Sequence, residues 1–484
     1  MGFKAFVVLV NVALVAAKAS ILISPEAFPT LPTVKQAAAA SSAVGLNLDN
    51  VQGDILVGMR KSSETFYFFS VNDGSAFKKS FRSGVFPLIT TTTQLLSVST
   101  QPTTALNVAF SQTGLLALNI TDDLGDTPFA TGQHADISNI GDASDANWVP
   151  AFAGTTVHGV FLFASDTQAN IDAEIANVEG ILGSSITKLH AIQGAARPGA
   201  EAGHEHFGYM DGISNPAVNG FVASPFPGQA VVDAGTILLG EINDPVTRPD
   251  WALDGSFLVF RQLEQLVPEF NQFLANNSIS DSSLTLTEQE GADLFGARLV
   301  GRWKSGAPIQ LSPLSDDPVL GANASRNNDF DYTELLGVLN TTGCPHSAHL
   351  RKTRPRSDLG SPEDAVHHIM RAGIPYGPEM NNTEISQNKT MAERGLAFVA
   401  YQSDISKGFQ FLQQFWINNA NFVVSGTGVD PLIGTVGGGS HDVLGLDPFT
   451  PAAVETVPMD FVVSRGGEYF FSPSLNALNS TTFE

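Results

Sequence analysis

The sequence TFYFFSV at Thr65–Val71 is followed by three stretches of the same kind: GVFLFAS at Gly159–Ser165, SFLVFR at Ser256–Arg261 and LAFVAY at Leu396–Tyr401. Each is short and rich in Val, Phe and Tyr or Ala, a composition that favours buried strands. Two of them lie before residue 200 and two after it, so both halves of the chain carry the pattern.

A segment with helical spacing of apolar residues follows each of these strands. The expected helices span residues 76–82, 169–182, 263–274 and 405–416. This alternation predicts an α+β fold of two related domains, each an antiparallel sheet with helices packed on one face. We place the domains at residues 45–200 and 201–484.

The composition excludes several classes of protein. The 484 residues are 43% hydrophobic and 15% charged, as in a globular protein. With 48 acidic and 25 basic residues the net charge is −23. We therefore expect no nucleic-acid partner, because no basic surplus is available to meet phosphates. The acidic balance suits solubility in an acidic medium, where part of the carboxylate charge is titrated.

The N-terminus predicts secretion. Lys4 precedes an apolar stretch over residues 6–17, and Ala17-Lys18-Ala19 offers a cleavage site, so residues 1–19 are expected to be a signal peptide. This stretch is shorter than the ~20 apolar residues that span a bilayer, and we expect no membrane segment. Residues 20–44, rich in Ala, Ser and Pro, predict a pro-segment or linker rather than a packed element.

The cysteine count and the glycosylation sites bear on a secreted protein in different ways. Cys344 is the single cysteine, which excludes an intramolecular disulfide, so the fold must rest on its own core. Glycosylation is expected at some of the Asn-x-Ser/Thr sites. These sites are Asn119, Asn276, Asn323, Asn340, Asn381, Asn388 and Asn479.

Three segments contain the candidate chemistry: HFGYMDGISNP at His206–Pro216, CPHSAHLRKTRPR at Cys344–Arg356 and HIMRAGIPYG at His368–Gly377. In the first, Asp211 is either a turn-forming residue or a buried acid with a shifted pKa. In the second, His349 precedes four basic residues. That pattern indicates either a solvated basic loop or an anion site beside a metal-ligating imidazole. Haem fits the latter, because it presents an iron and two propionates on one plate.

These segments resemble the dye-decolorizing peroxidase family. GYMDG matches the GxxDG motif of that family, AHLRKTRPR matches the segment with the axial histidine, and IMRAGIPYG matches the segment with the distal arginine. VQGDILVG near the start and GLAFVAYQSD near residue 400 extend the resemblance from about Leu48 to the C-terminus. It implies two ferredoxin-like domains and a haem b held mainly by the second. The sequence has no Cys-x-x-Cys-His motif, consistent with non-covalent attachment.

The resemblance also implies a role for individual residues. His349 would be the proximal iron ligand, with Asp211 and Arg371 on the side where peroxide binds. Leu396 and Phe398 would line this distal pocket. The remaining implied contacts are Arg356 as the best candidate for a propionate partner with Arg354 behind it, and Asp430 as the carboxylate beside the other nitrogen of His349.

Chemically, this arrangement predicts reduction of hydrogen peroxide and one-electron oxidation of dyes, phenols and lignin-derived aromatics. Asp211 would take up and return a proton, and Arg371 would stabilise negative charge as the O–O bond breaks. A carboxylate used as the base predicts an acidic optimum. Bulky donors would need a redox-active side chain outside the pocket; with only four Trp and six Tyr in the chain, the candidates are Trp416, expected near the surface, and Tyr376.

Other interpretations stay open at this point. His346 with His349, or His204-Glu205-His206, could bind a divalent metal, and Cys344 could be a thiolate ligand, although none has a complete matching motif. The chain could bind haem with chlorite-dismutase-like or no peroxidase turnover. It could also be a haem-free secreted binding protein. We further expect a monomer.

Overall fold

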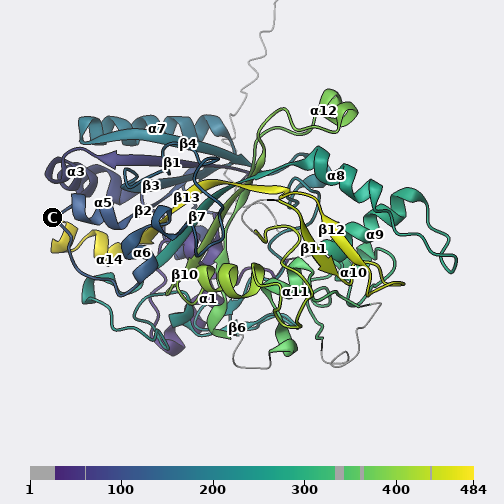
Figure 1. Ribbon diagram of the computed structural model, residues 1–484. Coiled ribbons are helices and arrows are strands. Elements are labelled where there is room, and N and C mark those ends of the chain that lie inside the picture. Colours follow the sequence, from purple (N-terminus) through teal and green to yellow (C-terminus); the bar gives the residue numbers. More distant parts are fainter. Residues whose placement is uncertain (1–27, 60–61, 333–342, 360–364, 436–438, 484) are drawn as a thin grey trace, which may run out of the picture.

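The computed structural model describes residues 28–59, 62–332, 343–359, 365–435 and 439–483. Figure 1 shows the arrangement of the elements. The strands are β1 Ser63–Val71, β2 Thr104–Phe110, β3 Gly159–Ser165, β4 Ile186–Ala195, β5 Ala217–Val218, β6 Val231–Val232, β7 Ser256–Gln265, β8 Met370–Arg371, β9 Ile374–Tyr376, β10 Gly395–Gln402, β11 His441–Leu444, β12 Val454–Val457 and β13 Val462–Ser472. The α-helices are α1 Val34–Val44, α2 Gly53–Val57, α3 Gly74–Ser80, α4 Thr92–Leu96, α5 Gln112–Ala117, α6 Thr127–Thr131, α7 Gln168–Leu182, α8 Val267–Asn276, α9 Glu288–Val300, α10 Pro318–Gly321, α11 His349–Thr353, α12 Asn382–Gln387, α13 Phe409–Phe411 and α14 Leu475–Leu478.

The main sheet confirms the predicted fold class. Among the described residues it has the strand order β7-β13-β2-β3-β1-β4-β9-β10-β8, and β7 also pairs with β10, which closes the sheet on itself. The first half contributes β4-β1-β3-β2. The second contributes β13, β7 and β10, then β8 and β9, which is the same relative order when the closed sheet is followed in one direction. Each half is therefore a ferredoxin-like α+β unit, and the two units share one continuous sheet.

The four aromatic stretches form β1, β3, β7 and β10, and they pair within each half, β1 with β3 and β7 with β10. Alternate residues of β1 enter two different cores. Phe66 and Phe68 belong to one buried cluster, whereas Tyr67 and Phe69 belong to another. Both faces of the sheet are thus covered, which explains why these strands are apolar throughout rather than alternating.

The expected helices agree with the structure to different degrees. The helix predicted over residues 169–182 is α7. The one predicted from residue 263 begins only at Val267, because β7 continues to pair with β10 as far as Glu264 and with β13 as far as Gln265. The one predicted from residue 405 begins at Phe409, because Asp404 accepts hydrogen bonds from Ser406 and Lys407 in a turn.

The N-terminal expectations have two outcomes. The predicted signal peptide lies outside the described residues. The expectation that residues 20–44 form no packed element is wrong for residues 34–44, which form α1. Ala37 is fully buried, and Ser41, one turn later, is also buried. Small side chains at these two positions let the helix lie close against the body, and an alanine-rich stretch resembles a linker in the sequence alone.

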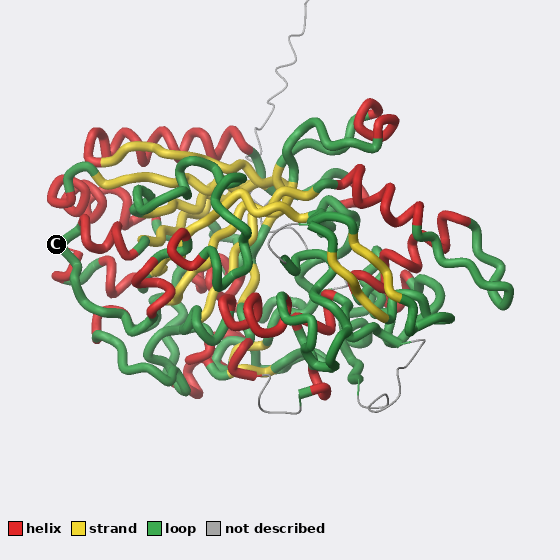
Figure 2. The backbone as a smooth tube through the Cα atoms, viewed as in Figure 1, coloured by secondary structure: helices red, strands yellow, loops and turns green. Residues whose placement is uncertain are grey.

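Figure 2 shows the strand-rich part of the molecule on one side and a loop-rich part, with α8 to α11, β11 and β12, on the other. Most of the loop-rich part is inserted between the strands of the second half. Within the described residues, no helix is long and apolar enough to cross a membrane.

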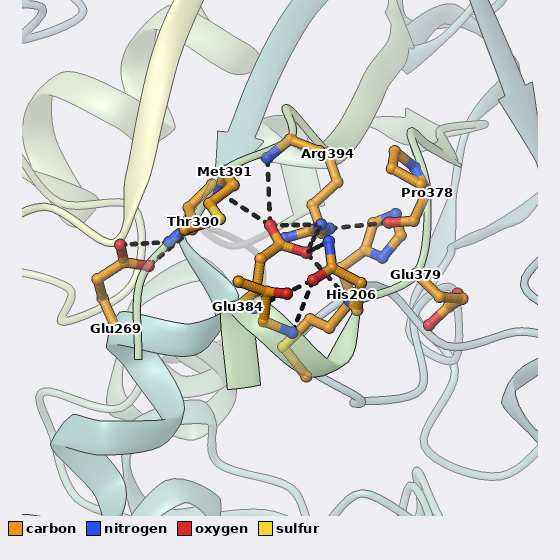
Figure 3. A network of polar contacts seen from close by, with 12 residues as sticks. His206, Glu269, Pro378, Glu379, Glu384, Thr390, Met391 and Arg394 are labelled. Carbon is orange, nitrogen blue, oxygen red and sulfur yellow. Dashed lines mark hydrogen bonds and ion pairs between the residues drawn. The ribbon is translucent and has the colours of Figure 1, made fainter. Parts of the chain in front are cut away.

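A buried ion pair fixes the loop that leads into β10 (Figure 3). Arg394 Nη2 lies 2.9 and 2.8 Å from the two carboxylate oxygens of Glu384, and neither side chain is exposed to solvent. Glu384 also accepts hydrogen bonds from the backbone N–H groups of Met391 and Asn381. Burial raises the pKa of Glu384, but these hydrogen bonds outweigh it and lower the pKa to about 2.

Replacing Glu384 with Gln should therefore destabilise the protein by about 3 to 5 kcal/mol, because the Arg394 charge would stay buried without its partner. The folded-state pKa of Glu384 is lower than its ordinary value of 4.5. Its contribution is thus present above pH 4.5 and is lost as the pH falls toward 2, and E384Q should lack this acid-dependent loss.

Urea unfolding at several pH values measures both effects. Glu201→Gln is the matched control, because Glu201 pairs with Arg197 at 3.1 Å but is 47% exposed. It should change stability by less than about 0.5 to 1 kcal/mol. Equal losses in the two variants would contradict this account of the buried pair.

Candidate active site

A cavity of about 290 Å³ lies beside the closed sheet. Its wall is made by β7 and β10, by the loop around Asp211, by α11 and by the turn after Asp430. Among the described residues, Asp142 is the single lining residue from the first half of the chain; the others have numbers above 200. The cavity brings together His349, Asp211, Arg371, Leu396 and Phe398, all five of which were singled out from the sequence.

His349 begins α11, and its ring orientation is fixed by Asp430. Nδ1 of His349 lies 2.7 Å from Oδ2 of Asp430. Asp430 is fully buried, and its other oxygen accepts hydrogen bonds from the backbone N–H groups of Leu432 and Ile433. Burial lowers the pKa of His349, but Asp430 outweighs this effect and the net pKa is raised. Nε2 is the nitrogen left to act as a ligand.

Asp211 and Arg371 form an ion pair at the same cavity. Nη1 of Arg371 donates a hydrogen bond to Oδ1 of Asp211, which also accepts one from the backbone N–H of Gly212 at 2.6 Å. Burial raises the pKa of Asp211, but Arg371 outweighs it and the pKa is lowered overall. Asp211 therefore makes a local turn contact and also lies in the cavity lining beside a cation.

Backbone contacts hold Arg371 in position. It ends β8, where it pairs with Ala400 of β10. Asn215 donates from its side-chain amide to the carbonyl of Arg371 at 2.8 Å and accepts from its N–H at 3.2 Å. The loop after Asp211 and the strand with Arg371 are thereby joined, so the ion pair is supported on both sides.

The strand β10 supplies the apolar wall. Leu396 and Phe398 line the cavity, whereas Ala397 and Val399 between and beyond them belong to the buried cluster on the other side. The ring of Phe398 contacts that of Phe409, with centroids 5.9 Å apart. Strand alternation therefore explains why these two positions face the cavity.

The structure places the two candidate basic residues differently. Arg354 lines the cavity, but Arg356 does not. The guanidinium of Arg356 donates to the carbonyl of Phe330 at 2.9 Å and to the side chain of Asn328 at 2.6 Å. Its charge lies over the Phe330 ring. Arg354 is thus the better placed of the two to meet a charged group in the cavity, and the partners of Arg356 come from a loop far away in the sequence.

Sequence reasoning also missed Arg302. It is buried, lines the cavity and donates to the carbonyls of Gly306 and Asn327. Burial lowers its pKa to about 9. No motif distinguishes this arginine in the sequence, so its position could not have been found without the fold.

These residues fit a haem. One imidazole has its orientation fixed by a buried carboxylate, apolar side chains cover the walls, and the cations of Arg354 and Arg302 lie in the lining. An iron ligand, a low-dielectric slot and positive charges near carboxylates are what the group requires. His349 would hold the iron, and the two arginines would meet the propionates.

The alternative ligand sets do not assemble. His204 and His206 bond to different backbone carbonyls, those of Lys304 and Tyr376. In the part of the chain that the structure describes, no three His, Cys, Asp or Glu side chains are placed to hold a metal ion. Burial raises the pKa of Cys344 to about 11, so its thiol is protonated near neutral pH.

The two electron-transfer candidates lie in different surroundings. Trp416 is only 4% exposed, which corrects the expectation that it lies at the surface. It contacts His367, a cavity-lining residue, with ring centroids 5.3 Å apart. The exposed aromatic residue beside it is Phe415, at 49%. Tyr376 is buried, donates its O–H to Glu393 at 2.9 Å and does not line this cavity.

Comparison with known proteins agrees with this geometry. Residues 50–198 match the model of the DyP dimeric alpha+beta barrel domain, and residues 204–447 match that of the Dyp-type peroxidase C-terminal domain. The chain belongs to the dye-decolorizing peroxidase family.

Several relatives are similar over nearly the whole chain. A dye-decolorizing peroxidase of Mycena epipterygia is 54% identical over 95% of this chain and 91% of its own length. The multifunctional dye peroxidase DyP2 of an Amycolatopsis strain is 30% identical over 91% of this chain and 97% of its own. A crystal structure of a decolorizing peroxidase from Auricularia auricula-judae, 52% identical, covers 91% of this chain and 100% of that chain with a TM-score of 0.88.

The protein is thus a peroxidase that oxidises dyes, and its family implies a haem. A haem-free binding protein and a haem protein without peroxidase turnover are both disfavoured by these similarities.

We predict that His349→Ala yields protein with little or altered haem, because the residue that would bind the iron is lost. His346→Ala is the matched control. His346 lies three residues earlier and does not line the cavity, and burial lowers its pKa to about 4. Haem content and the Soret band of the purified variants measure the effect. Loss of haem in the His346 variant alone would show that His346, and not His349, binds the iron.

Proposed function

We propose that this dye-decolorizing peroxidase is secreted and binds haem b without a covalent bond, mainly through its second half. It reduces hydrogen peroxide and oxidises dyes, phenols and lignin-derived aromatics in one-electron steps. The monomer is its working form. One observation supports the proposal most: a single cavity joins the His349–Asp430 pair to the Asp211–Arg371 pair.

When bound, the haem would supply the redox chemistry that splits peroxide. Nε2 of His349 would hold its iron, and Nδ1 would keep its hydrogen bond to Asp430. A carboxylate on this side makes the imidazole a stronger electron donor. The cations of Arg354 and Arg302 would bind the propionates.

Asp211 and Arg371 handle the proton and the charge of the substrate. The Asp211 carboxylate takes the proton from one oxygen of hydrogen peroxide and returns it to the departing oxygen. Such general acid–base catalysis typically raises the rate by ~10²–10⁴-fold. The Arg371 guanidinium stabilises the negative charge on that departing oxygen. Leu396 and Phe398 keep water and bulky molecules away.

Electrons from large donors need another route, and Trp416 is the best-placed relay. Its ring contacts His367 in the cavity wall and stacks on Phe422 at 5.1 Å. Phe411 links it to the exposed Phe415. Tyr376, hydrogen-bonded to Glu393, is the second candidate.

Secretion is supported by the predicted signal peptide and by the glycosylation sites. All of the described Asn-x-Ser/Thr asparagines lie in exposed positions, whereas Asn340 lies outside the described residues. Exposure at every one of these sites is compatible with N-linked glycans in the folded protein.

Replacing Asp211 with Asn should slow the reaction with peroxide about a hundredfold or more, because the shape stays but the base is lost. Arg371→Leu should act similarly through lost charge stabilisation. Stopped-flow absorbance of the haem band after mixing with peroxide measures the step. Wild-type rates in both variants would reject the assignment.

The same step should show a characteristic pH dependence. Asp211 acts in its ionised form, so the rate is lost as the pH falls through the Asp211 pKa, which Arg371 lowers below the ordinary 3.8. Activity should therefore persist in acidic solution. In Arg371→Leu the fall in rate should occur at a higher pH than in the wild type. A fall at the same pH would contradict the coupling between Asp211 and Arg371.

Trp416→Ser should abolish most turnover of a bulky anthraquinone dye while leaving peroxide reduction and small-phenol oxidation largely intact. Trp251→Ser is the control, because Trp251 is partly exposed but lies in a different cluster. Steady-state rates of both variants with the dye and with the small phenol measure the two activities separately. Undiminished dye turnover in the Trp416 variant would favour Tyr376 or direct access to the haem edge.

A further inference from the structure

We propose that residues 28–32, with α1 as their anchor, close the outer end of a passage to Asp211 and Arg371, so that cutting the chain after α1 opens access to the site. The inference rests on the proposed roles of Asp211 and Arg371. It concerns a part of the chain that precedes both matched family domains, the first of which begins at residue 50.

The passage is a second cavity, of about 310 Å³, next to the first. The two cavities share five lining residues: Glu205, Asp211, Gly212, Arg371 and Leu396. They therefore meet at the proposed catalytic pair. The other walls come from the loop after Asp211 and from β8 and β9. A small molecule in this second cavity would have a direct path to the Asp211 carboxylate.

The segment Phe28-Pro-Thr-Leu-Pro32 forms one wall of the passage, since all five of its residues line the second cavity. The Phe28 ring lies so close to Gly212 that a Cβ there would be 3.4 Å from Cε1. Leu31 packs against the main buried cluster, whereas Thr30 is exposed. The segment thus has one side toward the passage and the other toward solvent.

The helix α1 anchors this segment. Thr33 and Gln36 form a capping box: the Thr33 hydroxyl accepts from the Gln36 N–H at 3.3 Å, and the Gln36 side chain accepts from the Thr33 N–H at 2.9 Å. The two prolines restrict the backbone that enters the helix. The direction of residues 28–32 is therefore set by the helix that follows.

The anchor is also easy to release. Only Ala37 and Ser41 of α1 are buried, so the helix removes little apolar surface from water. Residues 42–45, Ser-Ala-Val-Gly, are all exposed, and Leu46 after them is buried. Exposed small residues are preferred sites of proteolysis. A cut here would separate the segment and its anchor from the body without breaking the main sheet.

A test uses the full-length haem protein with a specific protease site inserted between Gly45 and Leu46. The N-terminal fragment is removed by gel filtration after cleavage, and the association rate of azide with the ferric protein is compared before and after. If the segment is docked about 90% of the time, the rate should rise about tenfold. An unchanged rate after removal of the fragment would overturn the proposal.

Two controls separate access from other effects of cutting. The same site inserted after Ser283, in an exposed turn that lines neither cavity, should leave the azide rate unchanged after cleavage. In uncut protein, replacing Phe28 and Leu31 together with Ala should raise the rate, whereas Val34→Ala, on the exposed face of α1, should not. Equal increases at both cut sites would also overturn the proposal.

A second readout needs no haem. In the haem-free protein, backbone amides of residues 210–216 and 370–375 should exchange hydrogen faster after the cut at Gly45 than after the cut at Ser283. Equal exchange rates in the two cut proteins would count against a contact between residues 28–32 and the walls of the passage. If the azide rate rises after the cut at Gly45 while Asp211→Asn reacts with peroxide normally, closure by residues 28–32 is supported and the catalytic role of Asp211 is rejected. If the azide rate is unchanged while Asp211→Asn reacts slowly, closure is rejected and the catalytic role is supported.

Discussion

The site depends on the closure of one sheet across the two halves of the chain. Gly194 of β4 pairs with Tyr376 of β9, and β13 joins β2 at the opposite junction. A Cβ on Gly194 would lie 2.4 Å from a methyl carbon of Ile374, so the first junction needs glycine. Because β8, β9 and β10 follow this junction, it sets the position of Arg371 and Leu396 relative to the rest of the cavity.

Charge is distributed unevenly between the cavity and the rest of the chain. The chain has a net charge of −23, yet Arg302 and Arg354 line the cavity and Arg371 meets Asp211 there. Removing several guanidinium groups from water is costly unless negative charge faces them. The Asp211 carboxylate supplies part of that charge, and the carboxylates of a bound haem would supply more. In the proposed reaction Arg371 would also stabilise the negative charge that develops on peroxide.

Much of this could be predicted from the sequence, because the strand pattern and the three motifs are local. His349, Asp430, Asp211 and Arg371 were predicted individually; the structure brings His349, Asp211 and Arg371 to one cavity and places Asp430 against His349. The closure of the sheet, the place of Arg302 and the burial of Trp416 depend on contacts between distant segments, and no local pattern encodes those contacts. The packing of α1 was missed because a helix that buries only small side chains leaves little trace in a hydrophobic pattern.

The central claim is that one cavity holds a haem where His349 and the Asp211–Arg371 pair can act on peroxide together. The absorption spectrum of the purified protein in mildly acidic solution, before and after one equivalent of hydrogen peroxide, tests it most directly. The account predicts a Soret band that changes at once with peroxide and returns to its starting form when a reducing dye is added. A protein without a Soret band, or with one that peroxide leaves unchanged, would contradict it.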